Sequence, residues 1–179
     1  MTDLQLREAA LAEGFAAAEV VETGCIPFEP KFRVYCEENL CGKYGANHSC
    51  PPDCGTCEQM RQRIVTRRRA VVLQTNWDIP NLSDGAAIRR TKGTHNQASI
   101  ALMRKLRAAG VQGFMVGASG CALCDPCTAV SGEPCRYPDL QYSCMSAYCI
   151  HVSELCARCG LTYDLGPGRV AFFGMYVCD

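Results

Sequence analysis

Residues 113–135 read GFMVGASGCALCDPCTAVSGEPC. The first five residues form a short apolar run, which is typical of a strand buried in a sheet. A glycine-rich turn follows, and after it come four cysteines: Cys121, Cys124, Cys127 and Cys135. Ligands in open α/β sheets gather beyond the carboxyl ends of strands. The stretch therefore predicts an α/β fold in which this strand leads directly into a ligand-binding loop.

The spacing of these cysteines favours an iron–sulfur cluster. The first three are separated by two residues each, and Cys135 follows after seven more. A four-iron cluster is held by four thiolates, and a Cys-x-x-Cys-x-x-Cys loop can supply three of them. Zinc sites more often take two Cys-x-x-Cys pairs from separate turns. We therefore predict a four-iron cluster at this loop, with zinc as the alternative.

Residues 36–57 form a second cysteine-rich stretch, CEENLCGKYGANHSCPPDCGTC. The predicted ligands of a second cluster in this stretch are Cys36, Cys41 and Cys50. The spacing does not decide the fourth ligand. Cys54 is nearest, and Cys57 is the alternative because it falls in the first turn of a predicted helix, where the helix dipole stabilises a thiolate. A cluster with only three cysteine ligands would leave one iron open to a substrate.

Other residues are secondary candidates. His48 is predicted to hydrogen-bond to a metal ligand, with direct coordination as the alternative. Cys156 and Cys159 form a Cys-x-x-Cys pair on a short predicted helix. The pair could be redox-active, could supply ligands to the first cluster, or could simply pack near a cluster. Cys25 and Cys178 stand alone, and such cysteines are most often small buried hydrophobic residues.

The rest of the chain alternates helices and strands. Thr2, Thr56 and Thr94 each precede a glutamine by three residues, which is the pattern of a capping box at a helix start. The three predicted helices end near residues 18, 69 and 109, and the predicted strands cover 18–23, 70–75, 113–117 and 169–177. This alternation predicts one α/β domain over residues 1–179, with a largely parallel or mixed sheet flanked by helices. Two cysteine-rich loops, 24–57 and 118–160, are predicted beyond the strand ends.

Composition limits the class of protein. Hydrophobic residues make up 48% of the chain and charged residues 20%, as in globular domains. Fifteen cysteines without a secretory signal indicate metal ligands or redox centres in a reducing compartment. We therefore expect a cytoplasmic protein of an anaerobic or low-oxygen cell. No run approaches the roughly 20 apolar residues of a membrane span. Zero net charge makes nucleic acid an unexpected partner.

Both loops resemble a family of uncharacterised cysteine-rich proteins described as predicted metal-binding proteins, a domain of unknown function. The resemblance rests on Tyr35-Cys36, Cys41, Tyr44 and Cys50-Pro51-Pro52, on Cys121, Cys124, Cys127 and Cys135-Arg136-Tyr137-Pro138, and more weakly on Met145–Val152. It implies metal binding, with iron–sulfur clusters as the favoured form, and implies no known reaction. The chain departs from the family pattern at several positions: His48, Cys144, Cys149 and His151, with Cys54 and Cys57 as additional cysteines.

Three functions are compatible with these observations. The first is an electron-transfer or redox protein that holds two four-iron clusters and meets a redox protein partner or a small molecule. The second is an enzyme in which a cluster with an open iron acts as a reductant or Lewis acid. The third is a protein whose zinc ions only hold loops in place.

Overall fold

The computed structural model describes residues 1–179 and contains one five-stranded sheet with the order β1-β2-β5-β3-β4. The strands are β1 (Ala17–Glu22), β2 (Arg69–Asp78), β3 (Gly113–Gly117), β4 (Ser143–Cys144) and β5 (Arg169–Cys178). β3 pairs with β4 in parallel, and the other three pairings are antiparallel. The single α/β domain is confirmed, and its sheet is the mixed one of the two predicted alternatives.

The C-terminal strand explains why the sheet is not largely parallel. β2 and β3 both run antiparallel to β5, so the helix between them joins two strands of the same direction. The alternation of helix and strand predicts that parallel crossover correctly. It does not predict that β5 inserts between the two strands, because strand order depends on contacts between distant parts of the chain.

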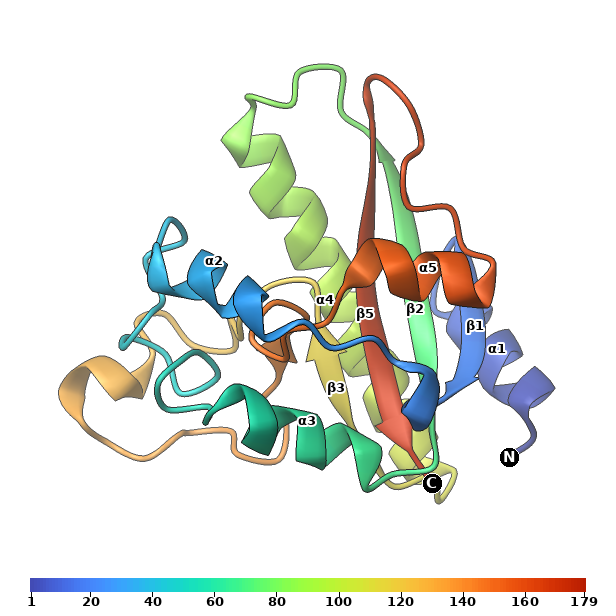
Figure 1. Ribbon diagram of the computed structural model, residues 1–179, viewed down its shortest axis with the longest axis horizontal. Coiled ribbons are helices and arrows are strands. Elements are labelled where there is room, and N and C mark those ends of the chain that lie inside the picture. Colours follow the sequence, from blue (N-terminus) through green and yellow to red (C-terminus); the bar gives the residue numbers. More distant parts are fainter.

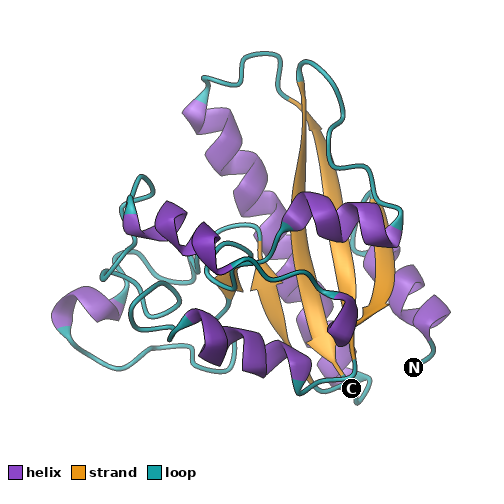
Figure 2. Cartoon of the chain, viewed as in Figure 1, coloured by secondary structure: helices purple, strands orange, loops and turns teal.

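Helices cover both faces of the sheet. They are α1 (Asp3–Ala12), α2 (Val34–Glu37), α3 (Cys57–Val65), α4 (Gly85–Ala108) and α5 (Val152–Cys159), with short 3-10 turns at Thr23–Cys25, Pro30–Arg33 and Thr128–Ser131. α1 and α4 lie behind the sheet in Figure 1, and α3 and α5 lie in front of it (Figures 1 and 2). No helix is both long and apolar enough to cross a bilayer.

The period-two alternation of the central strands builds two cores. Val71 and Leu73 of β2 pack in the core beneath α1 and α4, whereas Ala70 and Val72 pack in the core beneath α3 and α5. On β5, Met175 and Val177 likewise pack in the core beneath α3 and α5, and Tyr176 and Cys178 pack in the core beneath α1 and α4. The sheet is therefore buried on both faces, which explains the near-continuous apolar runs in its sequence.

Two of the three predicted capping boxes are confirmed. Thr2 and Thr56 accept the N–H of Gln5 and Gln59, whose side chains bond back to the threonine N–H groups. The prediction at Thr94 is wrong, because α4 already begins at Gly85 with Asp84 as its cap. Two helix ends also come earlier than predicted, since α1 ends at Ala12 and α3 at Val65.

The two cysteine-rich segments leave the sheet at opposite ends, because β1 and β3 run in opposite directions. After β1 the chain crosses the face that carries α3 and α5 and reaches α2 on the far side of β5 (Figure 1). Phe28 bridges Ile150 on the way, Glu29 N–H donates to the Cys149 carbonyl (2.7 Å), and His151 N–H donates to the Pro27 carbonyl (3.0 Å). This crossing carries the first group of cysteines to the second.

Candidate metal centre

The segment after β3 brings its four predicted cysteines close together. The Cys124 thiol hydrogen-bonds to Cys127, and Cys121 lies near enough to Cys124 and Cys135 to interact with their charges. Backbone N–H groups also point at these sulfurs: Leu123 and Tyr142 donate to Cys121, and Ala129 and His48 donate to Cys127. Amide donors of this kind stabilise thiolates that ligate iron.

Burial and hydrogen bonds from backbone N–H groups shift the pKa of a thiol in opposite directions, as Cys121 and Cys127 show. Burial raises the pKa of Cys121. Burial is also the largest single influence on Cys127, but the N–H groups of Ala129 and His48 outweigh it and lower the pKa of Cys127. The loop therefore makes the more exposed cysteine, Cys127, easier to deprotonate even before a metal binds.

The first group of cysteines gathers around Cys144 of β4. The Cys36 thiol donates a hydrogen bond to the Cys144 sulfur, which raises the pKa of Cys36 and lowers that of Cys144. Cys50 lies close to Cys144 and Cys41, and burial raises the pKa of Cys50 to about 12. The N–H groups of residues 146 and 147 donate to the Cys144 sulfur. Three thiols of the first cysteine-rich stretch thus lie together with one from β4: Cys36, Cys41, Cys50 and Cys144.

Cys144 is the residue that the spacing of the first stretch misses. It is far from Cys50 in sequence, and it reaches the site only because β4, two residues long, pairs in parallel with β3. The one signal for it in the sequence is the departure from the family pattern at this position. Cys144 is thus a candidate fourth ligand beside the predicted Cys54.

Cys54 and Cys57 lie next to Arg33. The Arg33 guanidinium donates from Nε to Cys57 Sγ (3.4 Å) and from Nη1 to Cys54 Sγ (3.8 Å). Cys54 is buried and close to the charge of Cys144, whereas Cys57 contacts Cys149 instead. Cys54 therefore borders the first group, and Cys57 belongs to a separate contact.

Hydrogen bonds join the two groups of cysteines. Cys121 N–H donates to Ser49 Oγ (2.9 Å), and the Cys121 carbonyl accepts from Asn47 Nδ2 and Lys43 Nζ, both at 3.0 Å. Gly120 lies so close to the first group that a Cβ there would meet Cys50 Sγ at 2.9 Å. The glycine-rich turn thus allows the second loop to pass directly over a cysteine of the first.

A cavity of about 460 Å³ opens between the two loops. Cys41, Cys124 and Cys127 line it together with Lys43 and Asn47. No three His, Cys, Asp or Glu side chains are already arranged to hold one metal ion. The donors and the space available are those that a cluster needs. The thiols form two groups of four, backbone N–H groups donate to three of the sulfurs, and a cavity lies between the loops. These features suit iron–sulfur ligation.

The His48 ring is occupied by oxygen acceptors. Its Nε2 lies 2.8 Å from the Glu133 carbonyl, and its Nδ1 lies 3.3 Å from an Asp53 carboxylate oxygen. Its backbone N–H donates to Cys127. His48 thus supports a candidate ligand from the opposite loop, which is the role predicted for it, although the bond comes from its backbone and not from the ring.

The remaining cysteines lie away from both groups. Cys156 is buried in the core beneath α5, and burial raises its pKa to about 12. Cys159 lies near Glu19 of β1. Cys178 is fully buried on β5, as expected for a small hydrophobic residue, whereas the same expectation is wrong for Cys25, which is exposed. The structure does not bring Cys156 and Cys159 to the first group.

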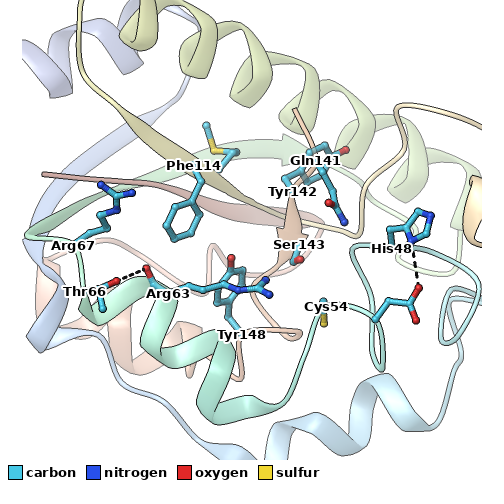
Figure 3. A pocket seen from close by; sticks show the side chains of 12 residues that line it. His48, Cys54, Arg63, Thr66, Arg67, Phe114, Gln141, Tyr142, Ser143 and Tyr148 are labelled. Atoms are coloured by element: carbon cyan, nitrogen blue, oxygen red, sulfur yellow. Dashed lines mark hydrogen bonds and ion pairs between the residues drawn. The ribbon is translucent and has the colours of Figure 1, made fainter. Parts of the chain in front are cut away.

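A second cavity, of about 430 Å³, lies beside the first group (Figure 3). Arg63 and Arg67 of α3 and the loop after it line one side, while Tyr142, Ser143 and Tyr148 line another. Arg67 is paired with Asp179 (2.6 Å), whereas Arg63 has no carboxylate partner and interacts with Tyr148. Burial raises the pKa of Tyr148 to about 12, so its hydroxyl remains protonated at neutral pH. The cavity thus offers one free cation and a phenol, and Cys54 and His48 line it as well.

Comparison with known proteins agrees with the cysteine geometry. The family model described as predicted metal-binding protein (DUF2284) matches residues 19–177. The match includes both cysteine groups and all five strands except the first two residues of β1 and the last residue of β5. No curated protein and no solved structure matches the chain.

The chain therefore belongs to this family, and it is a cysteine-rich, predicted metal-binding protein.

Proposed function

We propose that the chain holds two four-iron clusters in adjacent loops and acts in electron transfer. The second site would use Cys121, Cys124, Cys127 and Cys135, and the first would use Cys36, Cys41, Cys50 and a fourth cysteine, for which Cys144 is favoured over Cys54. When bound, the clusters would supply one-electron redox chemistry. The observation that supports this function best is the pair of adjacent four-thiol groups joined through Ser49, Asn47 and Lys43.

The side chains around the thiols have separate tasks. Lys43 places a cation between the groups, where it lowers the proton affinity of Cys50 and Cys127. The amides of residues 123, 129 and 147 donate to sulfur and would stabilise the more reduced, more negative state. Gly120 keeps the loops in contact, so electrons would pass between neighbouring sites in one small protein.

Iron and sulfide analysis of anaerobically purified protein tests this function. We expect about eight irons per chain, as two four-iron clusters require, and a visible absorption that bleaches on reduction. Cys124→Ser should remove about half of the iron by eliminating one cluster. Colourless protein that contains only zinc would overturn the proposal in favour of a structural zinc protein.

The fourth ligand of the first site needs matched variants. Cys144→Ser is expected to lower the iron content of the first site. The Cys144 sulfur contacts Cys36 and accepts hydrogen bonds from two backbone N–H groups, as a cluster ligand would. Cys54→Ser is expected to retain that iron. The reverse pattern would restore Cys54 as the fourth ligand, and retention of four irons in the double variant would indicate an iron without a cysteine ligand.

The cavity in Figure 3 favours a second candidate, an enzyme that reduces a bound anion beside the first site. The observation in its favour is Arg63, whose guanidinium reaches Tyr148 and has no carboxylate to neutralise it. Phosphate binding, measured by calorimetry on the metal-loaded protein, provides a probe. Arg63→Gln should weaken it, whereas Arg104→Gln, on the exposed face of α4, should not. Equal binding by both variants would exclude the cavity as an anion site.

A further inference from the structure

Cys57 and Cys149 form a close pair outside both groups of cysteines. Cys57 is the first residue of α3, and Cys149 lies in the turn before α5 with a left-handed φ of 56°. Their sulfurs are 2.9 Å apart. A disulfide has an S–S length of about 2.05 Å, so the two sulfurs need to approach by less than about 1 Å to bond. Neither cysteine belongs to the two groups of four thiols described above.

This spacing suits a dithiol better than a metal site. Two thiolates bound to one tetrahedral zinc at about 2.3 Å lie about 3.8 Å apart, and thiolates on different irons of a cluster lie farther apart still. The observed contact is shorter than either arrangement. No His, Asp or Glu side chain joins the two cysteines to complete a ligand set.

Arg33 holds a positive charge against the pair. Its Nε lies 3.4 Å from Cys57 Sγ, and its Nη2 donates to the carbonyls of Gly55 (3.2 Å) and Ala147 (2.9 Å). These carbonyl contacts fix the plane of the guanidinium, so the charge stays directed at the Cys57 sulfur. A cation beside a thiol stabilises the thiolate, which is the nucleophile in disulfide exchange.

The two cysteines differ in access to solvent. Cys57 is partly exposed, whereas Cys149 is only 1% exposed. A disulfide in solution can therefore reach Cys57 but not Cys149. Such an arrangement separates an attacking cysteine from a resolving one.

We propose that Cys57 and Cys149 are a redox-active dithiol that reduces a low-molecular-weight disulfide. The Cys57 thiolate attacks one sulfur of the disulfide, forms a mixed disulfide and releases one thiolate, which takes up a proton. The Cys149 thiolate then attacks Cys57 Sγ and releases the second thiol. Two protein thiols become one protein disulfide, and the substrate takes up both electrons and both protons.

The hydrogen bonding of the pair agrees with this division of roles. Burial alone would raise the pKa of Cys57, but hydrogen bonds from the Cys149 thiol and Arg33 outweigh it and lower the pKa of Cys57. The pKa of Cys149 is raised by burial and by the hydrogen bond that Cys149 donates to Cys57. The proton thus stays on Cys149 until Cys57 has reacted.

Glutathione disulfide is the probe for this activity. Anaerobically purified, metal-loaded protein is incubated with it, alkylated and digested, and the peptides are identified by mass spectrometry. We expect a Cys57–Cys149 linkage that reduced glutathione reverses. Cys149→Ser should instead trap one glutathione per chain on Cys57, and Cys57→Ser should form neither product. Arg33→Gln should slow the reaction severalfold, because loss of the cation lowers the fraction of Cys57 thiolate, although the more basic thiolate is also the stronger nucleophile.

Control measurements separate this activity from metal binding. Cys25→Ser removes an exposed thiol and should leave the Cys57–Cys149 linkage unchanged. Iron measured in the same samples reports on the two clusters, so loss of one property is distinguishable from loss of the other. Linkage of Cys57 to a different cysteine, a persistent glutathione adduct in the unmodified chain, or protection of both thiols from alkylation by bound metal would each overturn the proposal.

Discussion

His95 is a fully buried side chain in the middle of α4, packed edge-on against Phe15. Its Nδ1 lies 2.9 Å from Thr75 Oγ1, while its Nε2 has no hydrogen-bond partner. Burial lowers the pKa of His95 from 6.5 to about 4. The folded protein therefore keeps this imidazole neutral, whereas the unfolded chain protonates it below about pH 6.5.

The consequence is a loss of stability in mild acid. Between about pH 6.5 and 4 the unfolded state binds the proton that the folded state excludes, so the free energy of unfolding falls as the pH falls. From pH 7 to 5 this histidine should account for about 2 kcal/mol of that loss. Urea unfolding at both pH values measures it, and His95→Gln should show a correspondingly smaller loss. Equal losses in the two proteins would contradict the buried, neutral state.

Gly120 provides a second prediction at the level of one residue. A Cβ added there would meet Cys50 Sγ at 2.9 Å and a Lys43 side-chain carbon at 3.4 Å. Gly120→Ala should therefore push the two loops apart, lower the free energy of unfolding by about 1–3 kcal/mol and reduce the metal content. Gly24→Ala is the control, because nothing lies within 4 Å of the position of its Cβ. Unchanged metal content in Gly120→Ala would show that close contact between the loops is not needed.

Among the elements, α3 depends on its N-terminal cap, which also positions Cys57. Thr56 accepts the Gln59 N–H (3.2 Å), and Gln59 Oε1 accepts the Thr56 N–H (2.9 Å). Thr56→Ala should lower the free energy of unfolding by about 1 kcal/mol. Thr94→Ala is the matched control, since Thr94 lies inside α4, where alanine is at least as favourable as threonine. Chemical denaturation measures both, and equal destabilisation would contradict the different roles.

Thr56 and Thr94 also show how far the sequence predicts the elements. Both precede glutamine at the same spacing, so local pattern cannot distinguish a helix start from a helix interior. The difference comes from Asp84, which accepts the N–H groups of Ala86 and Ala87 and starts α4 earlier. Four of the five strands are predicted more closely, because burial on both faces leaves apolar runs that few other structures share. The two-residue strand β4 is not predicted and falls within the loop expected over 118–160.

The same distinction applies to the candidate site. Cysteines close together in sequence, such as Cys121 and Cys124, were predicted to lie together because a short loop cannot separate them. Cys144 and Cys149 join their partners only through the crossing of the first segment over the sheet. Spacing along the chain contains no information about that crossing.

At the scale of the molecule, residues 61–110 contain eleven arginines and lysines and only two acidic residues, but these charges do not form one cationic face. α3 lies on one side of the sheet and α4 on the other (Figure 1), so their arginines and lysines are divided between two surfaces. Arg67 pairs with Asp179, and Lys105 pairs with Glu13. The free charge next to the cysteines is thus limited to a few residues, among them Lys43 and Arg63.

The two cysteine groups should behave as one folding unit, because Ser49 connects them. Ser49 is fully buried; its hydroxyl accepts the Cys121 N–H and donates to Asn47 Oδ1 (2.8 Å). Ser49→Ala leaves a buried N–H without an acceptor, which should lower the free energy of unfolding by about 1–3 kcal/mol. Cys50 of the first group follows Ser49 directly, and Cys121 of the second group loses the acceptor of its N–H. Metal content should therefore fall at both sites together. Ser153→Ala, on the exposed side of α5, should change neither stability nor metal. Metal analysis and urea denaturation measure both effects. If Ser49→Ala loses metal from only one site, the two loops fold independently.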